Sequence, residues 1–567
     1  MEQTYNSMIE TTTADYLADI DMDLVPSSTS IEAELLELVN REIRAYNLGP
    51  EDPNAPANAS IKDRYPNQKA PNERWHILKK LENSQIAMII TKVYRACRIC
   101  WLGVENDKNY TIGLYQDAGD NRGIYDTRED IIEEIIRKYN FTIDSKAIKE
   151  VIKALENFAP KKVRCSNRDL IPVKNGIFDY RNKILMDFDP EYVFTTKSYV
   201  DYIDGVTNPV ITMPDGELWD VESWMSSLSD DAEVVELLWQ VVGSIIRPTV
   251  RFDKVVLLYS TLGNNGKGTL CEFMRNICGE RSHTSIPVKD FGKDYMLKPL
   301  LYVSAIIVDE NDTGTFLNSA DSFKAAITHD IIRANIKFKE PIDVRFEGMM
   351  VQCVNEIPKF QDKSESLYRR LLPIPMNKSF KGIERKYIKK DYLARSEVLE
   401  YALHKVLNTD YYELSEPSAC VELLGEVKQF NDPVRQFLDE SLSEFSWDLI
   451  PNDYLYMFYL GWFKKYVPSG KPVSKTAFTK EVKQLIKDGY PDWDETPHQV
   501  SPKGKMDYPE PLILEYDVVV LRDSTYKGSD PNKICTPSQV MYGKKYRGIQ
   551  RVVTAIKLRR DANDIDN

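Results

Sequence analysis

The pattern of apolar positions changes at about residue 254. From there the chain carries short, almost uninterrupted apolar runs at residues 255–259 (VVLLY), 302–308 (YVSAIIV), 349–354 (MMVQCV) and 371–376 (LLPIPM). Strands that are apolar on both faces are typical of a parallel sheet covered by helices on each side. The pattern therefore predicts an α/β core, which we place within residues 216–385.

The region before this core alternates helical and strand patterns. Apolar residues at helical spacing in residues 130–141 (DIIEEIIRKYNF) predict an amphipathic helix, and residues 110–115 (YTIGLY) predict a short strand. The turn dipeptides Asn175-Gly176 and Arg181-Asn182 lie between apolar runs and predict two consecutive hairpins. We expect an α+β domain over residues 75–215.

The two ends of the chain differ in charge. The first forty residues carry nine acidic residues and no Lys or Arg, and residues 47–71 are rich in Pro, Asn and Ala. We therefore expect residues 1–74 to form an acidic N-terminal segment and a flexible linker. Residues 531–560 carry eight Lys or Arg and no acidic residue, so that segment is the expected contact for a polyanion.

Two helical patterns follow the core near the C-terminus. They cover residues 453–466 and 475–488, the second with Ser474 as its N-cap and Gly489 as its stop. The lysines of the second helix lie largely away from its apolar side. We expect the surface that carries these lysines to contact DNA. These candidate residues are Lys475, Lys480 and Lys483.

A strand and a basic segment complete the C-terminal pattern. The apolar run at residues 512–521 (LILEYDVVVL) is expected to be a strand, and residues 542–553 (YGKKYRGIQRVV) carry the basic side chains. Together with the two helices they predict a winged-helix-like DNA-binding domain over residues 431–567. Residues 386–430 are expected to be a helical connector.

Composition places the chain among soluble globular proteins. Of its 567 residues 42% are hydrophobic and 28% charged, and the net charge is −13. With no apolar run near the roughly 18 residues that span a bilayer, and no signal-peptide pattern, we expect a cytoplasmic protein that does not bind membranes. Eight scattered cysteines do not form a disulfide framework. The one CxxC pair, Cys97 and Cys100, lacks the further ligands of a zinc site, so we expect two buried thiols on a helix.

A glycine-rich turn follows the first apolar run of the core. Residues 260–270 (STLGNNGKGTL) lead into a helical pattern that Gly279 ends, which is the strand, loop and helix order of a phosphate-binding loop. Glycines let backbone N–H groups turn toward phosphate oxygens, and the helix N-terminus adds a favourable dipole. The residues expected to surround the nucleotide are Gly263, Asn264, Asn265, Gly266, Lys267, Gly268 and Thr269.

The loop departs from the usual pattern at two positions. Thr261 replaces the first glycine, and Gly268 replaces the hydroxyl residue that binds magnesium. Lys267 is expected to neutralise the β and γ phosphates of ATP, and Thr269 offers the missing hydroxyl to Mg²⁺. Because the Gly-Lys-Gly-Thr ending is also similar to that of adenylate kinases, a small-molecule kinase is an alternative.

Polar side chains follow or precede the next apolar runs. Asp309 and Glu310 end one run, where Asp309 is expected to hold Mg²⁺ and Glu310 to activate the attacking water. Asn355 ends another and is expected to sense the γ-phosphate. Arg369 and Arg370 precede the last run and are expected to reach the nucleotide of a neighbouring subunit as an arginine finger.

The order GNNGKGT, IIVDEN, VNEIPKF and YRRLLPIPM resembles motifs A, B and C and the arginine finger of superfamily 3 helicases. The resemblance is strongest to the phage, plasmid and poxvirus primase-helicase branch, which includes replication initiators of bacterial mobile elements such as staphylococcal pathogenicity islands. It implies a P-loop AAA+ domain that forms a hexameric ring, hydrolyses ATP and translocates on DNA, here in the cytosol of a bacterial host. The resemblance covers residues 80–560, most strongly 165–380.

The same resemblance implies a DNA-gripping hairpin between Glu310 and Asn355. Lys324 matches the lysine of a further motif, and residues 336–339 match the hairpin tip, with Lys337, Phe338 and Lys339 as candidate DNA contacts. Lysines bind phosphates without regard to sequence, and an aromatic ring can contact sugar or base. A second alternative is an initiator that uses ATP only as an assembly switch and does not unwind DNA processively. Primase activity in residues 75–215 lacks a convincing pair of metal-binding carboxylates.

Overall fold

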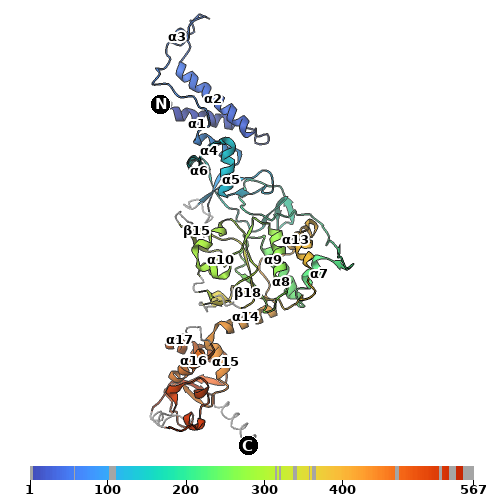
Figure 1. Ribbon diagram of the computed structural model, residues 1–567, viewed down its shortest axis with the longest axis vertical. Helices are drawn as coiled ribbons and strands as arrows, with labels where there is room; N and C mark the ends of the chain where they lie inside the picture. The colour runs from blue at the N-terminus through green and yellow to red at the C-terminus, as the bar shows by residue number, and fades with distance from the viewer. Residues whose placement is uncertain are drawn as a thin grey trace. The chain divides into compact units, whose positions relative to one another are not determined.

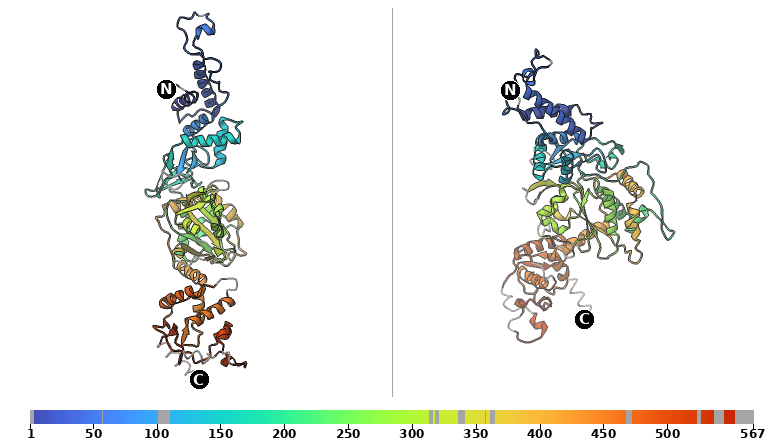
Figure 2. Two further views of the ribbon diagram at one scale, coloured as in Figure 1. Left: turned by 90° about the vertical axis from the view of Figure 1, so that its left-hand side faces the viewer. Right: turned by 45° about the horizontal axis from the view of Figure 1, so that its top comes forward.

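The computed structural model describes residues 4–56, 58–100, 110–312, 316–317, 321–335, 341–356, 358–360, 365–466, 472–522, 526–535 and 544–552. The chain divides into two compact units, Met1–Leu423 and Leu424–Asn567 (Figures 1 and 2). The finer division into five parts stays a prediction. Within the described ranges, no helix combines the length and the apolar character needed to cross a membrane.

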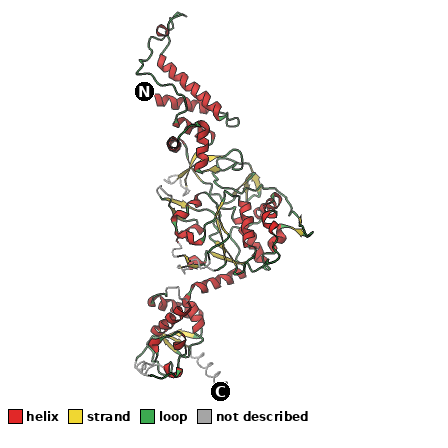
Figure 3. Cartoon of the chain, in the orientation of Figure 1, coloured by secondary structure: helices red, strands yellow, loops and turns green. Residues whose placement is uncertain are grey.

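The N-terminal part of the first unit is helical, and its described residues before Cys97 contain no strand (Figure 3). Its helices are α1 (Tyr5–Ala18), α2 (Ser28–Leu48), α3 (Ile61–Arg64) and α4 (Asn83–Val93). The Ser27 hydroxyl caps α2 by accepting a hydrogen bond from the Ser30 N–H. The short helix α3 lies within the segment predicted to be a linker.

A four-stranded sheet of order β3-β2-β1-β4 follows. Its elements are β1 (Cys97–Cys100), β2 (Tyr110–Tyr115), β3 (Tyr125–Asp126), α5 (Glu129–Tyr139), α6 (Ser145–Phe158) and β4 (Lys161–Val163). The predicted strand at 110–115 and the predicted amphipathic helix are confirmed. Both thiols of the CxxC pair are buried, as expected, but the helix predicted for them is wrong. They lie in β1, because that segment has strand partners on both sides, antiparallel β2 and parallel β4.

The two predicted hairpins form a three-stranded antiparallel sheet. Its strands are β5 (Leu170–Val173), β6 (Gly176–Asp179) and β7 (Ile184–Met186). The small hairpin of β8 (Ile211–Thr212) and β9 (Leu218–Trp219) comes next, followed by α7 (Val221–Ser226) and α8 (Ala232–Ser244).

The core holds a five-stranded sheet of order β11-β12-β16-β10-β18, in which every pairing is parallel. Its strands are β10 (Val255–Tyr259), β11 (His283–Thr284), β12 (Ala305–Val308), β16 (Met349–Val354) and β18 (Leu371–Pro375). The prediction of a mixed α/β fold with a parallel sheet is confirmed. The sheet strands are apolar because helices cover them, with α10 on one side and α8, α9 and α13 on the other (Figure 1).

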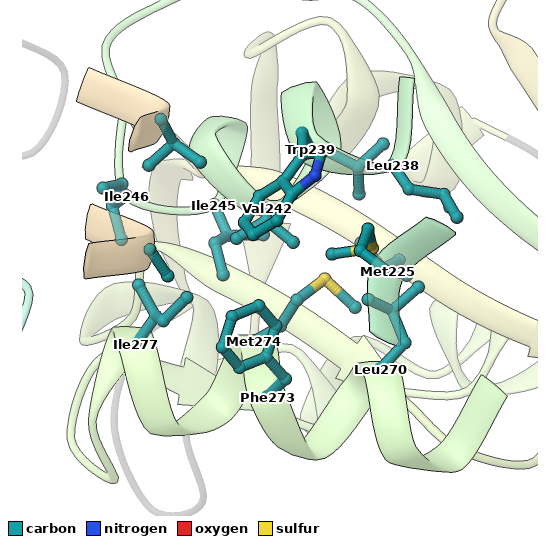
Figure 4. Packing of buried hydrophobic residues seen from close by; sticks show 14 of the residues in the cluster. Met225, Leu238, Trp239, Val242, Ile245, Ile246, Leu270, Phe273, Met274 and Ile277 are labelled. Carbon is teal, nitrogen blue, oxygen red and sulfur yellow. The ribbon is translucent and has the colours of Figure 1, made fainter. Parts of the chain in front are cut away.

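Helix α9 (Lys267–Cys278) follows the glycine-rich loop and ends at Gly279, which has a φ of 81°, as the sequence predicts. Its inner face carries Leu270, Phe273 and Met274, which pack against Trp239 and Val242 of α8 (Figure 4). These side chains are buried, so the helix that begins at Lys267 is fixed to the sheet by a continuous apolar core.

Shorter elements complete the first unit. They are η1 (Val288–Gly292), η2 (Asp294–Met296), η3 (Lys298–Leu301), β13 (Phe316–Leu317), α10 (Asp321–Ile327), β14 (Ile331–Ala334), β15 (Ile342–Arg345), β17 (Lys359–Phe360), α11 (Glu365–Tyr368), α12 (Lys386–Lys390), η4 (Tyr392–Ala394) and α13 (Ser396–Asn408). Helix α14 (Ser418–Asn431) runs across the division between the units.

The second unit has its own apolar core around Trp447, Phe458 and Trp462. Its elements are α15 (Pro433–Ser441), β19 (Leu449–Pro451), α16 (Asn452–Tyr466), α17 (Lys475–Gly489), β20 (Trp493–Glu495), α18 (Leu512–Glu515), η5 (Val519–Leu521), α19 (Pro531–Ile534) and β21 (Gly548–Arg551). The strands form an antiparallel sheet of order β19-β21-β20.

The two predicted helices of the second unit are confirmed, with Ser474 as the N-cap of α17. The strand predicted at residues 512–521 is wrong, since this run forms α18 and η5. Leu512, Ile513 and Leu521 are buried, so helical turns remove these apolar side chains from water as a strand would have done. A short apolar run does not distinguish the two by periodicity alone.

Candidate functional site

The glycine-rich loop, the acidic pair and Asn355 lie together at one edge of the sheet, formed by the carboxyl ends of the parallel strands. The register pairs Tyr259 with Val354 and Val308 with Gln352, so β10, β12 and β16 end at nearly the same level. The glycine-rich loop, the Asp309-Glu310 pair and Asn355 follow directly after these ends. In open α/β sheets ligands bind beyond the carboxyl ends of the strands, which makes this edge the candidate site.

The loop between β10 and α9 has the backbone shape of an anion cradle. Asn264 and Gly266 have φ angles of 55° and 86°, in the left-handed region. The buried Asn265 side chain fixes the turn, because its amide donates to the Leu262 carbonyl at 2.5 Å and its oxygen accepts from the Lys267 N–H at 3.3 Å. Left-handed residues turn successive N–H groups toward a common point.

Lys267 lies in the middle of this edge. Its ammonium donates to the carbonyls of Ser260 at 3.2 Å and Val354 at 3.1 Å, and to the side-chain oxygen of Asn355 at 2.7 Å. The residue is only 6% exposed, and burial lowers the pKa of its amine. The structure thus brings together two residues predicted to act on the same phosphate.

The acidic pair after β12 is held in place by two side chains. Asp309 accepts hydrogen bonds from the guanidinium of Arg275 on α9, at 2.5 Å and 3.1 Å. The next residue but one, Asn311, is buried and donates to Gln352 and to the Cys353 carbonyl of β16, both at 3.0 Å. Glu310 stands between these anchors in the chain and is exposed.

The sequence analysis missed Arg275 and Asn311. Arg275 follows Lys267 by eight residues, about two helical turns, which puts both on one face of α9. That spacing was a usable signal for Arg275. No local pattern could identify Asn311, because its role depends on contact with β16, some forty residues later in the chain.

A magnesium ion bound to phosphate fits the residues at this edge. Among the described residues no group of three His, Cys, Asp or Glu side chains could hold a metal alone. Mg²⁺ usually keeps several waters and takes one or two protein ligands together with substrate phosphates. The Thr269 hydroxyl and the Asp309 carboxylate are oxygen ligands of the kind it prefers.

The two predicted arginine-finger residues lie at the amino-terminal ends of the parallel strands, opposite the ends that the glycine-rich loop follows. They precede β18, whose first residue Leu371 pairs with Val255 at the start of β10. Five strand residues at about 3.3 Å each separate that level from the loop. Arg369 is exposed, whereas Arg370 is half-buried and donates to the carbonyl and hydroxyl of Ser366. Neither is near Lys267 of its own chain.

The predicted DNA contacts are only partly described. Lys324 lies on α10 and pairs with Asp321 at 3.5 Å. Strands β14 and β15 form an antiparallel hairpin, but its predicted tip, with Lys337, Phe338 and Lys339, lies outside the described residues.

The three candidate lysines of the second unit all lie on α17 and are exposed. Lys475 pairs with Asp453 at 2.8 Å, and Lys483 pairs with Glu495. Exposed ion pairs of this kind are weak, so DNA phosphates could replace either acidic partner. Lys480 is exposed and, among the residues that the structure describes, its side chain forms no ion pair, so it is the best placed of the three to meet a phosphate directly.

Three family models match successive parts of the chain. Residues 72–230 match the model described as D5 N terminal like, residues 258–370 match a family of unknown function designated DUF5906, and residues 429–510 match the model described as poxvirus D5 protein-like. No curated protein matches the chain at a significant level. Two of the three models thus describe D5-related segments, one before and one after residues 258–370.

Solved structures of the NrS-1 C-terminal region are also similar to this chain. An apo structure of that region is 13% identical, with 74% of this chain and 98% of that chain covered and a TM-score of 0.38. An A-form apo structure is 13% identical, with coverages of 84% and 100% and a TM-score of 0.37. A shorter A-form structure is 15% identical, with coverages of 73% and 97% and a TM-score of 0.38. At such TM-scores these structures add nothing to the description of the site.

Proposed function

We propose that this protein is an ATP-dependent DNA helicase and replication initiator of a phage or mobile genetic element. Its first unit would contain a P-loop AAA+ core that assembles into a ring of six subunits and moves along DNA. The observation that carries the proposal is the contact of Lys267 with Asn355, which joins the phosphate-binding loop to the end of a neighbouring parallel strand. The two D5-related family matches support the link to replication.

In this proposal Lys267 and the loop N–H groups bind the phosphates of ATP. A bound magnesium ion would neutralise phosphate charge, with Thr269 and Asp309 as its protein ligands. Glu310 is exposed beside Asp309, so its carboxylate can accept a proton from the attacking water. Asn355 would give up its hydrogen bond with Lys267 and bind the γ-phosphate instead. The contacts of Asn355 at the end of β16 would therefore differ between the ATP-bound and the ADP-bound protein.

The position of the two arginines supports hydrolysis between subunits. An arginine that precedes β18 is separated from its own loop by the length of the sheet strands. A neighbouring copy in a ring can present that edge to the loop, in the head-to-tail contact that builds cyclic assemblies. Arg369 is the better candidate for this contact because it is exposed, while Arg370 is bonded to Ser366 of its own chain.

Mixing experiments test this arrangement. Lys267→Ala chains and Arg369→Ala/Arg370→Ala chains are each expected to lack ATPase activity, because one lacks the cradle and the other the finger. A mixture of the two is expected to regain part of the activity, since some interfaces then combine an intact loop with an intact finger. A monomeric kinase would regain none, and activity in the doubly substituted arginine chains alone would refute the shared site.

Strand displacement separates a motor from an assembly switch. The wild-type oligomer is expected to unwind DNA duplexes of increasing length in the presence of ATP, and Glu310→Gln is expected to bind ATP and DNA without unwinding. Lys337→Ala/Lys339→Ala is expected to keep basal ATPase activity and to lose unwinding. Unwinding limited to the shortest duplexes would favour an initiator that uses ATP only for assembly.

A further inference from the structure

A cavity of about 580 Å³ adjoins the phosphate-binding loop. Asn264, Gly266 and Thr269 form the side of the cavity that belongs to the loop. Its volume falls within the range of small-molecule sites. The remaining walls come from residues 213–228 and 380–389, which lie outside the sequence motifs predicted to bind the nucleotide.

One wall is formed by residues that precede the core, among them Trp219 of β9 and Trp224 of α7. Both indoles are nearly buried, and each is fixed by another ring. Trp219 packs on Tyr392 with ring centroids 5.2 Å apart, and Trp224 packs on Phe273 at 5.5 Å. Aromatic and aliphatic side chains therefore line this wall together with Glu217, Ser223 and Ser227, and a flat heterocycle can pack against its apolar part.

The opposite wall is formed by residues 380–389, which follow β18. Two hydrogen bonds tie this segment to the loop, since the Phe380 N–H donates to the Asn264 carbonyl at 2.7 Å and the Asn264 side chain donates to Glu384 at 2.6 Å. A β-carbon at Gly266 would come within 2.7 Å of Leu228 from the first wall and 3.4 Å of Phe380 from the second. Both walls thus meet at the loop glycine.

Lys389 of α12 brings a second ammonium group to the start of α9. Its nitrogen lies 3.6 Å from the point where a β-carbon of residue 268 would stand, which is ordinary van der Waals contact and places the ammonium beside the first turn of α9. Within the described part of the chain Lys389 has no acidic partner. A cation at a helix N-terminus is electrostatically unfavourable unless an anion lies with it. Bound phosphate would supply that anion.

We propose that the cavity holds the base and ribose of a purine nucleoside triphosphate, and that Lys389 binds its phosphates together with Lys267. This inference rests on the proposed nucleotide site and adds the purine base as the ligand that the two walls recognise. It also couples the segment after β18 to nucleotide binding, because that segment contributes both a wall and a cation.

Binding of a fluorescent ATP analogue to the full-length protein tests the role of Lys389. Lys389→Ala is expected to weaken binding about tenfold, as the loss of one charge-assisted contact predicts. Lys390→Ala is the matched control, because Lys390 lies on the same short helix, is exposed and does not line the cavity; it is expected to leave affinity unchanged. Equal affinities of the Lys389 and Lys390 variants would overturn the inference.

Photolabelling tests the base pocket independently. An 8-azidopurine triphosphate is expected to label peptides that contain residues 213–228 or 380–389, and label confined to other peptides would overturn the assignment of the cavity. Lys267→Ala distinguishes a failure of the proposed nucleotide site from a failure of the inference about the cavity and Lys389. If Lys267→Ala binds the fluorescent analogue as the wild type does, the proposed nucleotide site itself fails. If Lys267→Ala loses binding while Lys389→Ala keeps it, only the present inference fails.

Discussion

Lys267→Met gives the sharpest test of the nucleotide site, because the structure predicts opposite consequences with and without ligand. The Lys267 ammonium is buried and bonded to three neutral oxygens. Those bonds stabilise the fold by about 1 kcal/mol each, but burial of the charge costs a comparable amount. Methionine fills the same space without the charge, so the free protein is expected to change little in stability.

The loss on ATP binding follows from the same geometry. A charge-assisted bond to phosphate contributes about 1.5–3 kcal/mol, so the variant is expected to bind ATP about 10–150 times more weakly. At an ATP concentration of about 100 times the wild-type Kd, ligand stabilises the wild type by about 2.7 kcal/mol. A variant with a Kd raised about a hundredfold gains only about 0.4 kcal/mol.

Thermal unfolding with and without ATP and magnesium measures both effects. For a cooperative unit of 423 residues, a gain of about 2.7 kcal/mol corresponds to a rise in Tm of about 3 °C, against about 0.5 °C for the variant. Lys390→Met is the control and is expected to respond to ATP as the wild type does. An unchanged ATP response in Lys267→Met would refute the phosphate role, and a large loss of stability without ATP would refute the reasoning about the buried charge.

Three further predictions concern stability. Gly279→Ala is expected to destabilise the first unit by about 2–4 kcal/mol, because at its φ of +81° a β-carbon would lie 2.3 Å from the Tyr199 ring. Glu510→Ala is expected to cost the second unit about 2–4 kcal/mol, since the buried carboxylate accepts the N–H groups of Ser446 and Trp447. Burial lowers the pKa of Lys197 from 10.5 to about 8. The folded state therefore loses this proton before the unfolded chain does, stability rises with pH across that interval, and Lys197→Met removes this part of the rise.

A control variant accompanies each of these three stability predictions. Gly382 has a φ of +83° with nothing within 4 Å of a β-carbon, so Gly382→Ala should cost less than Gly279→Ala in the same thermal scan. Glu510→Gln keeps an oxygen acceptor and should lose less than Glu510→Ala. Lys153→Met removes an exposed lysine of α6 that is not among the charges acting on Lys197, and it should leave the pH profile of Tm unchanged. A Lys197→Met profile parallel to the wild type between pH 8 and pH 10.5 would contradict the assignment of that titration.

Local sequence signals were sufficient for the strand, loop and helix around Lys267. The buried run of β10, the turn at Gly266 and the helix end at Gly279 follow from residues within a few positions of one another, whereas the other left-handed residue of the loop is Asn264 and not the expected Gly263. Parallel strands apolar on both faces predicted the sheet, and polar residues after their ends predicted which side chains meet. The same local reasoning failed for β1 and α18, where a short apolar run is compatible with either helix or strand and distant partners decide.

The amino-acid sequence by itself determined the glycine-rich loop between strand and helix and the polar residues that follow the strand ends, because turn chemistry, capping and apolar periodicity act over a few residues. Only the tertiary structure decided that Arg275 holds Asp309, that the two arginines lie away from their own loop, and that residues 213–228 and 380–389 enclose one cavity. Those relations join segments separated by tens to more than a hundred residues. They depend on which surfaces the folded core brings together, and no pattern within a single segment carries that information.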